Sequence, residues 1–165
     1  MIYIVGCNHG IQPVDADPFD GEQVFAQRAH FRELIRRLIR ENNIQFVGEE
    51  WGRDNKTVAH VLAEENGNIP WSNINTSREE LDAMKIPRNY GNEAHSPDQI
   101  EKWHRQREAV MRKKIAEAKG DAERIVVICG FVHLQPLTEL LKKTFELVEP
   151  LDYRSRDWYA NVFVE

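Results

Sequence analysis

The stretch Ile125-Val126-Val127-Ile128-Cys129-Gly130-Phe131-Val132-His133 sets the pattern of the chain: an apolar, mostly β-branched run is followed by Gly-x-x-His. The N-terminus repeats this pattern, because Ile2-Tyr3-Ile4-Val5 is followed by Gly6-Cys7-Asn8-His9. A third run, Ile44-Gln45-Phe46-Val47, leads into Gly48 and then Glu49-Glu50. Short runs of this kind, bounded by glycine, are typical of buried strands. The sequence therefore predicts three strands that end in two histidines and a pair of carboxylates.

Helical patterns separate these strands. One helix is expected from Asp20 or Gly21 to about Asn42, and a second from Ser96 to about residue 118, where Ser, Pro and Gln occupy the favoured first positions. A helix that begins near Pro136, a strand at 145–148 and an edge strand at 159–164 complete the pattern. Alternating strands and helices predict one three-layer α/β/α domain over residues 1–165, with a mainly parallel sheet of four to five strands.

Residues 51–96 are the least regular part of the chain. A short helix is expected at about 57–65, and Ser77-x-x-Glu80 resembles a capping box that opens another. An insertion of this length between a strand and the next long helix is usually functional or disordered. With Trp51, Trp71 and Tyr90 in it, the segment is interpreted as an ordered lid of helices and loops over the site.

The bulk composition excludes several classes of protein. A formal charge of −5 and a pI near 5.7 leave no footprint for nucleic acid or an anionic membrane. No stretch approaches the roughly 20 apolar residues of a membrane span, and the first residues lack a signal peptide, so a cytoplasmic protein is expected. Cys7 and Cys129 are interpreted as small buried hydrophobes, not as a disulfide. The expected partner is a small-molecule or peptide substrate, and a homo-oligomer is left open.

The polar residues that follow the strands indicate a site. Parallel sheets bind ligands beyond the carboxyl ends of their strands, so His9, Glu49, Glu50 and His133 should gather there. If the first and third strands are neighbours, the two histidines face each other. Imidazole and carboxylate together suit a divalent metal (Mn, Co, Fe or Zn), and His9, Glu49 and His133 are the predicted ligands. Glu49 is preferred to Glu50, which is expected to act as a base or to support the ligands. A metal-free pair of histidine and carboxylate is the alternative.

Arg107 is the residue that is hardest to explain by packing alone. At 100° per residue it projects near the middle of the apolar stripe of its helix, and an unpaired buried charge costs several kcal/mol. It is therefore expected to meet an anion. Gly6 and Gly130 are expected to permit the tight turns that aim each histidine. His30, His60 and His104 are interpreted as surface or boundary residues, and His95 as a weaker site candidate.

These residues resemble the motifs of the TraB/TIKI superfamily, which includes erythromycin esterase-like proteins, TraB/PrgY and ChaN-like haem-binding proteins. The matching residues are Gly6-Cys7-Asn8-His9, Gly48-Glu49-Glu50, Arg107-Glu108 and Gly130-Phe131-Val132-His133. The family pattern often has Asn or Asp after the arginine, where this chain has Glu108. The resemblance implies a minimal member with an α/β/α core and a site at the strand ends. It also implies metal-dependent hydrolysis in some branches and haem or iron binding in another.

Residues and resemblance together predict a metal-dependent hydrolase of peptide, ester or lactone bonds. His9, Glu49 and His133 would hold the metal, Glu50 would assist as a base, and Arg107 would orient a carboxylate or stabilise an oxyanion. The alternative is a non-catalytic protein that binds a metal, haem or a small ligand in the same cleft.

Overall fold

A computed structural model describes residues 1–15, 22–87, 90, 95–145 and 148–153 of the chain. The described strands are β1 (Ile2–Cys7), β2 (Phe46–Glu49), β3 (Trp71–Asn73), β4 (Ile125–Gly130) and β5 (Val148–Asp152). The helices are α1 (Glu22–Glu41), α2 (Val58–Glu65), α3 (Arg78–Ala83), α4 (Pro97–Ala118) and α5 (Phe131–Lys142), and a short 3-10 turn, η1 (His9–Ile11), follows β1.

The strands form one sheet in the order β3-β2-β4-β1-β5, and every pair is parallel. The predicted α/β class is therefore confirmed, and the first Gly-x-x-His strand pairs directly with the second, an arrangement that the sequence left open. Their register places Gly6 opposite Cys129 and Cys7 opposite Gly130. Because β4 also pairs with β2, the carboxyl ends of β1, β4 and β2 lie side by side at one edge of the sheet.

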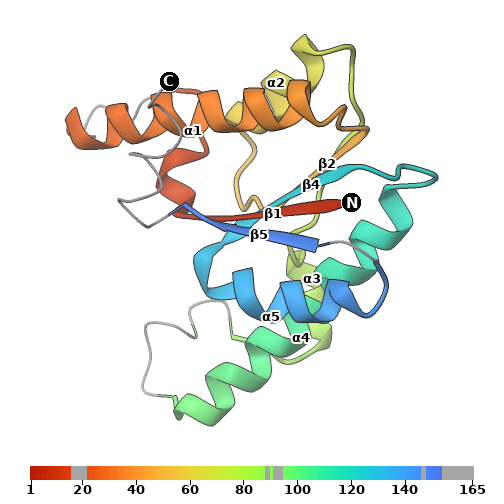
Figure 1. The fold of residues 1–165 in the computed structure, drawn as a ribbon. Coiled ribbons are helices and arrows are strands. Elements are labelled where there is room, and N and C mark those ends of the chain that lie inside the picture. The colour runs from red at the N-terminus through yellow and green to blue at the C-terminus, as the bar shows by residue number, and fades with distance from the viewer. Residues whose placement is uncertain (16–21, 88–89, 91–94, 146–147, 154–165) are drawn as a thin grey trace.

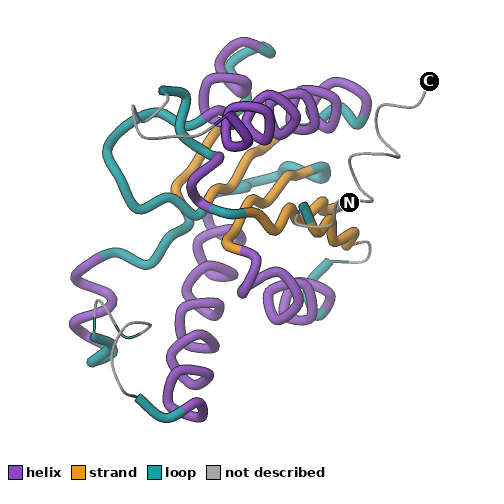
Figure 2. The backbone as a smooth tube through the Cα atoms, turned by 90° about the vertical axis from the view of Figure 1, so that its left-hand side faces the viewer, coloured by secondary structure: helices purple, strands orange, loops and turns teal. Residues whose placement is uncertain are grey.

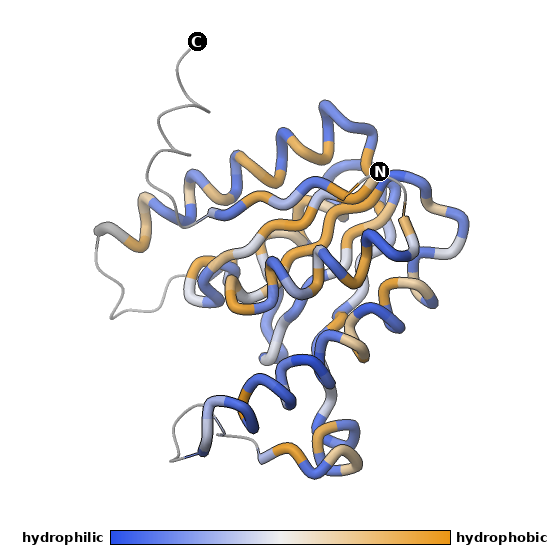
Figure 3. The backbone as a smooth tube through the Cα atoms, turned by 60° about the horizontal axis from the view of Figure 1, so that its bottom comes forward, coloured by the Kyte–Doolittle hydropathy of each residue, from blue (hydrophilic) through white to orange (hydrophobic). Residues whose placement is uncertain are grey.

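Helices cover both faces of the sheet, with α1 and α2 on one side and α4 and α5 on the other (Figures 1 and 2). Alternate residues of a strand belong to two separate hydrophobic cores. In β4, Val126 and Ile128 pack with α1 and α2, whereas Val127 and Cys129 pack with α4 and α5. The strands consequently form the apolar centre of the molecule, between helices that are polar outside (Figure 3). Burial on both faces explains why these strands read as continuous apolar runs.

Local signals define several helix ends. Ser77 and Glu80 form the predicted capping box of α3, and Ser96 with Pro97 opens α4 as expected. Asn43, at φ 49°, follows the end of α1 in the left-handed conformation that asparagine tolerates. These boundaries were predictable because each depends on contacts within a few residues.

The segment 51–96 differs from the predicted lid. Val58, Ala59, Leu62 and Ala63 of α2 belong to the same core as α1, and β3 extends the sheet beside β2. Most of the segment between 57 and 73 is thus part of the main layers, because its apolar residues are needed to cover β2. Thr57 and Trp71 of this part contact Glu49, and the part that follows contributes Asn75 and Tyr90, which contact Arg107.

Two boundaries near the C-terminus also differ from expectation. Helix α5 begins at Phe131, directly after β4, so Pro136 lies inside the helix and His133 in its first turn. The fourth strand along the chain was predicted at 145–148, but β5 starts at Val148 and runs to Asp152. The edge strand predicted at 159–164 lies outside the described residues.

Candidate functional site

The carboxyl end of β1 delivers His9 to the predicted edge of the sheet. Asn8 caps the 3-10 turn η1, and the Nδ1 atom of His9 lies 2.6 Å from Gln12 Oε1. The opposite ring nitrogen, Nε2, lies 3.8 Å from Glu50 Oε2. The His9 side chain is 49% exposed, so this imidazole joins the buried site to solvent.

Glu49 and Glu50 are both buried, but they have different surroundings. Glu49 Oε1 accepts a hydrogen bond from Gln12 Nε2, while Oε2 accepts one from Thr57 Oγ1 at 2.5 Å and one from Trp71 Nε1 at 3.0 Å. Burial raises the pKa of Glu49, and the three hydrogen bonds oppose that rise only in part. Glu49 therefore acts as an internal acceptor that ties the end of β2 to α2 and β3.

Glu50 is the carboxylate that both predicted histidines approach. Its Oε1 lies 2.6 Å from Arg107 Nη2 and 3.7 Å from His133 Nε2, and its Oε2 accepts the Gly130 N–H at 2.8 Å. Burial alone would raise the pKa of Glu50, but His133, His9 and Arg107 together lower it below its usual value. Glu50 is therefore ionised at neutral pH.

Arg107 has the anionic partner that its position on α4 predicted. Besides Glu50, its guanidinium donates to Tyr90 Oη at 2.9 Å and to Asn75 Oδ1 at 3.0 Å. Its side chain is 16% exposed, so most of this ion pair is shielded from water. The loop residues Asn75 and Tyr90 thus fix the arginine that in turn fixes Glu50.

The two motif glycines make room for the opposite motif. A Cβ at Gly130 would lie 2.8 Å from His9 Nε2, and a Cβ at Gly6 would lie 2.9 Å from both Cβ and Cδ2 of Leu134. Gly130 has φ −58° and ψ 141°, a conformation open to any residue, so its predicted role in a special turn is not needed. Glycine is required at both positions because β1, β4 and α5 approach one another too closely to leave space for a Cβ atom.

His133 lies in the first turn of α5 and is 1% exposed. Its Nδ1 atom lies 2.9 Å from Oε1 of Glu108, which comes from α4 and is itself 1% exposed. When Nδ1 carries the proton, Nε2 keeps its lone pair and faces Glu50. A carboxylate behind an imidazole in this way fixes the orientation of the ring.

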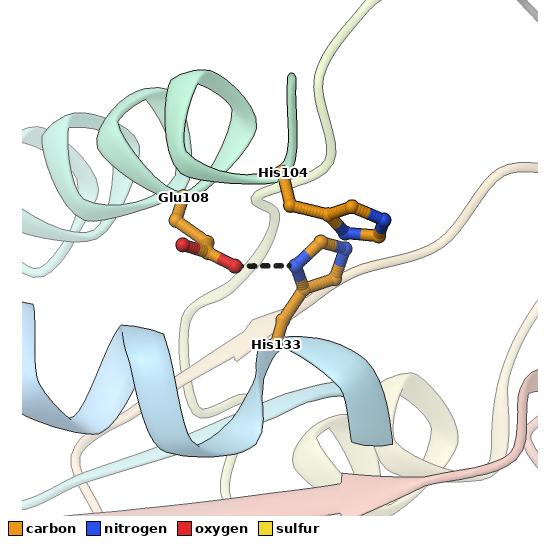
Figure 4. A group of neighbouring side chains, drawn as sticks. All are labelled: His104, Glu108 and His133. Atoms are coloured by element: carbon orange, nitrogen blue, oxygen red, sulfur yellow. Dashed lines mark hydrogen bonds and ion pairs between the residues drawn. The ribbon is translucent and has the colours of Figure 1, made fainter. Parts of the chain in front are cut away.

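His104 completes a compact group with these two residues. Its ring centroid lies 4.9 Å from that of His133, and His104, Glu108 and His133 each offer a ligand atom within 4.8 Å of the others (Figure 4). Burial lowers the pKa of His104, and the neighbouring His133 and Arg107 lower it further. A neutral imidazole pair with one carboxylate could hold a metal ion.

The two buried carboxylates of the site have different partners. Glu50 and Glu108 are buried, and among the described residues no lysine or arginine is buried to the same degree. Arg107 is the cation in contact with Glu50, whereas the hydrogen-bond partner of Glu108 is the imidazole of His133. The surroundings of Glu108 therefore leave room for a cation that contacts the carboxylate and an imidazole together.

The structure thus brings His9, Arg107 and His133 around the carboxylate of Glu50, at the carboxyl edge of the sheet. Glu49 lies next to them but directs its oxygens to Gln12, Thr57 and Trp71. Sequence reasoning missed two residues, His104 and Glu108. Their spacing of four residues on one helix was the available signal, since such pairs lie on the same face.

Other predicted residues lie elsewhere. His60 stacks on Trp71 at 4.3 Å between ring centroids, and His95 packs edge-on against Trp103 at 4.8 Å. Cys7 and Cys129 are free and buried, and burial raises the pKa of both thiols well above the ordinary value. These cysteines are therefore packing residues, as expected.

Comparison with known proteins adds no relative: no family model, no curated protein and no solved structure matches the chain. In the part of the chain that the structure describes, no helix is both long and apolar enough to cross a membrane.

Proposed function

We propose that this protein is a metal-dependent hydrolase that cleaves ester, lactone or peptide bonds at the carboxyl edge of its sheet. The observation that carries the proposal is the compact group of His104, Glu108 and His133 beside the Glu50–Arg107 ion pair. It combines a site for a divalent cation with an ionised carboxylate that lies 3.7 Å from one of the imidazoles.

The donor set fits a divalent cation. Two imidazoles and one carboxylate are common ligands of Zn, Mn, Fe and Co, and three protein ligands leave further positions open. The lowered pKa of His104 keeps its ring neutral, as a ligand must be, and the buried carboxyl of Glu108 has an imidazole, not an arginine or lysine, as its hydrogen-bond partner. A bound cation would act as a Lewis acid and lower the pKa of water at the site.

The neighbouring residues have roles that follow from their contacts. Glu50 is ionised and can accept a proton from water, provided that it keeps its orientation through Arg107 and the Gly130 N–H. Arg107 supplies positive charge beside Glu50, where it would stabilise an oxyanion. His9 is half-exposed and can pass the proton on to solvent.

This assignment changes the predicted ligand set. The sequence placed Glu49 on the metal with His9 and His133, whereas the hydrogen bonds of the two glutamates favour Glu50 as the reactive carboxylate and Glu49 as support. In the proposal, His104 and Glu108 join His133 as ligands, and His9 serves as a proton carrier.

Metal titration followed by activity assays tests the proposal. Metal-free protein is titrated calorimetrically with Zn and Mn, and ester, lactone and peptide panels are then assayed with and without a chelator. Wild-type protein should bind one ion and lose hydrolysis on chelation, and the variants His104→Ala and His133→Ala should weaken binding at least tenfold. His30→Ala, on α1 outside the site, is the matched control. Hydrolysis that survives full chelation would contradict the metal-dependent mechanism and select the metal-free pair.

The second candidate is a non-catalytic protein that holds a metal, haem or a small ligand. One observation favours it: both oxygens of Glu50 already have partners, Arg107 and the Gly130 N–H, which restrain it as a base. A Soret band after reconstitution with haem, lost in His104→Ala and accompanied by no turnover on the panels, would select this alternative.

A further inference from the structure

A groove of about 810 Å³ lies between α4 and α5, outside the ring of contacts around Glu50. Its volume is within the range of small-molecule sites. Apolar side chains from both helices form much of its lining: Pro97, Ile100, Ala109, Val132, Pro136 and Leu140. The groove is therefore largely apolar, and it is formed by two helices that pack on the same face of the sheet.

The groove is continuous with the proposed metal site. His104 and Glu108, two of the three residues of that group, also line the groove. His133, the third, is buried behind them at 1% exposure. A molecule that lies along the groove would thus bring one end against the groove-facing ligands of the metal group.

Away from the proposed metal site, the charged residues of the groove balance. Apart from Glu108, which belongs to that site, the lining includes two acidic residues, Glu101 and Glu139, and two basic residues, Arg105 and Lys143. Glu101 pairs with Arg105 at 2.5 Å, and Glu139 pairs with Lys142 at 3.0 Å. Beyond Glu108 the groove therefore has no surplus charge with which to select a charged ligand, and its apolar lining favours an uncharged chain.

Exposed apolar residues mark the end of the groove beside the site. Val132 is 48% exposed and lines the groove, and its neighbour Phe131 is 41% exposed. Both lie in the first turn of α5, one or two residues before His133. Large apolar side chains left in water at the mouth of a hydrophobic groove are typical of a ligand-binding rim.

We propose that the α4–α5 groove binds a linear hydrocarbon chain of the substrate and presents the adjoining carbonyl to His104 and Glu108. The substrate class is accordingly an uncharged ester or amide of a medium-length or long acyl chain. The part concerning the carbonyl rests on the proposed hydrolase function, whereas binding of the chain depends only on the groove.

A binding assay tests the groove without requiring catalysis. The neutral dye N-phenyl-1-naphthylamine is bound to metal-free protein and displaced by straight-chain alcohols of six, eight and ten carbons. Each added methylene should strengthen displacement by up to about fourfold, the value for complete burial of one CH₂. Ala109→Trp, which places an indole in the groove from an exposed helical position, should weaken displacement by the longest alcohol at least tenfold.

The control is Ala118→Trp, an equally exposed alanine of α4 on the opposite side of the helix and outside the groove lining. It should behave as wild type, and circular dichroism with thermal melting would verify that both variants fold. Displacement without dependence on chain length, or equal displacement in Ala109→Trp and wild type, would overturn the proposal. A change of oligomeric state in Ala109→Trp without such dependence would also overturn it, and would show a protein interface instead.

A second measurement separates this proposal from the hydrolase. The ratio of kcat/KM for p-nitrophenyl octanoate to that for the acetate is compared in Ala109→Trp and wild type. A selective loss on octanoate supports the acyl groove. Alcohol displacement that follows chain length, together with no hydrolysis of either ester, supports the groove as a chain-binding site and contradicts the hydrolase.

Discussion

At the scale of single residues, Glu49 and Glu50 illustrate how neighbours in sequence acquire different roles. Glu49 belongs to β2 and is enclosed by donors, whereas Glu50 follows the strand and meets charged side chains. The apolar runs in the sequence predicted that carboxylates would gather here and favoured Glu49 as the ligand, whereas the contacts in the structure favour Glu50. Gln12 and Thr57, which lie outside β2, donate hydrogen bonds to Glu49 and hold its carboxylate away from the histidines.

Replacement of Glu49 by alanine should destabilise the fold while leaving the metal ligands in place. The variant removes the common acceptor of Gln12, Thr57 and Trp71. Gln12 Nε2 keeps the Glu50 carbonyl oxygen at 3.2 Å, whereas Thr57 and Trp71 lose their acceptor, and each donor left without a partner costs about 1–3 kcal/mol. Urea unfolding at pH 7 should therefore show a loss of at least roughly 2 kcal/mol. Zinc affinity measured below the unfolding transition should stay within a few-fold of wild type; abolished binding would restore Glu49 as a ligand.

The ionisation of His104 should appear in the pH dependence of metal binding. Burial, His133 and Arg107 lower its pKa from the ordinary value of 6.5, so the folded ring is neutral at pH 6.5 and above. Protons should compete with metal only at more acidic pH. The same shift means that the unfolded chain binds more protons, so this residue's contribution to stability is lost as the pH falls from 6.5 through the lowered pKa.

A titration followed by NMR of the His104 ring proton in metal-free protein would measure this pKa directly. The midpoint should lie below that of histidine in a short unstructured peptide under the same conditions. A midpoint equal to or above the peptide value would show that the ring is more solvated than its contacts indicate. In that case the acid limb of metal binding would have to arise from another ligand.

At the scale of elements, the two Gly-x-x-His segments pack against each other. Strands β1 and β4 are neighbours, and α5 rises directly from β4 so that Leu134 lies on Gly6 and His9 lies on Gly130. The repeated motif was visible in the sequence, which left the order of the strands open. The reciprocal use of the glycines was not visible there, because it depends on how closely a helix approaches a strand.

Alanine substitutions at the two glycines should have unequal effects. At Gly6 the new Cβ would meet Leu134 Cβ, which can move only with the α5 backbone, so unfolding stability should fall by about 1–3 kcal/mol. At Gly130 the new Cβ would meet the end of the His9 ring, which is half-exposed and can swing away. Gly130→Ala should therefore be the milder of the two in chemical denaturation.

The same pair of variants has a second readout. In Gly130→Ala, displacement of His9 should change the NMR shift of its ring protons and leave those of His133 nearly unaltered. In Gly6→Ala, the shift of α5 should alter the His133 signals. Equal destabilisation by both variants would mean that His9 is held more rigidly than its exposure suggests.

The packing of α4 explains why the sequence did not predict His104 and Glu108 as site residues. The buried residues of the helix are Trp103, Glu108, Met111 and Ile115, three apolar side chains and one glutamate. A stripe chosen by hydrophobicity alone passes over a buried glutamate. His104 and Glu108 became part of the site because the helix turns that face toward α5, which supplies His133.

At the scale of the whole molecule, metal binding and folding should be coupled. The three proposed ligands come from α4 and α5, and the unfolded chain cannot hold them together. An ion that binds the folded state alone stabilises it by about 2.7 kcal/mol at a free concentration one hundred times its Kd. Chemical denaturation with and without Zn should show this increase in wild-type protein and in His30→Ala.

The same increase should be absent from His133→Ala, which loses the ligand that lies between the two helices. The comparison uses the difference within each variant, so a lower starting stability of His133→Ala does not affect it. An equal gain in wild type and His133→Ala would show that the ion binds elsewhere, and it would remove the main support for the metal centre.

The sequence by itself determined the class of fold, the main helices and the edge of the sheet at which the polar residues gather. These features follow from periodicity, capping residues and the alternation of strands with helices, all of which act over short distances along the chain. The sequence also predicted that Arg107 meets an anion, since a charge on an apolar helical face requires a partner.

Only the tertiary structure decided which side chains share the site. It selected Glu50 for Arg107, enclosed Glu49 among donors, placed His104 and Glu108 beside His133, and put α2 and β3 into the main layers where a lid was expected. The physical reason is that each of these outcomes depends on the rotation of a helix or the order of strands. Those are set by the packing of the whole core, and residues near in sequence carry little information about them.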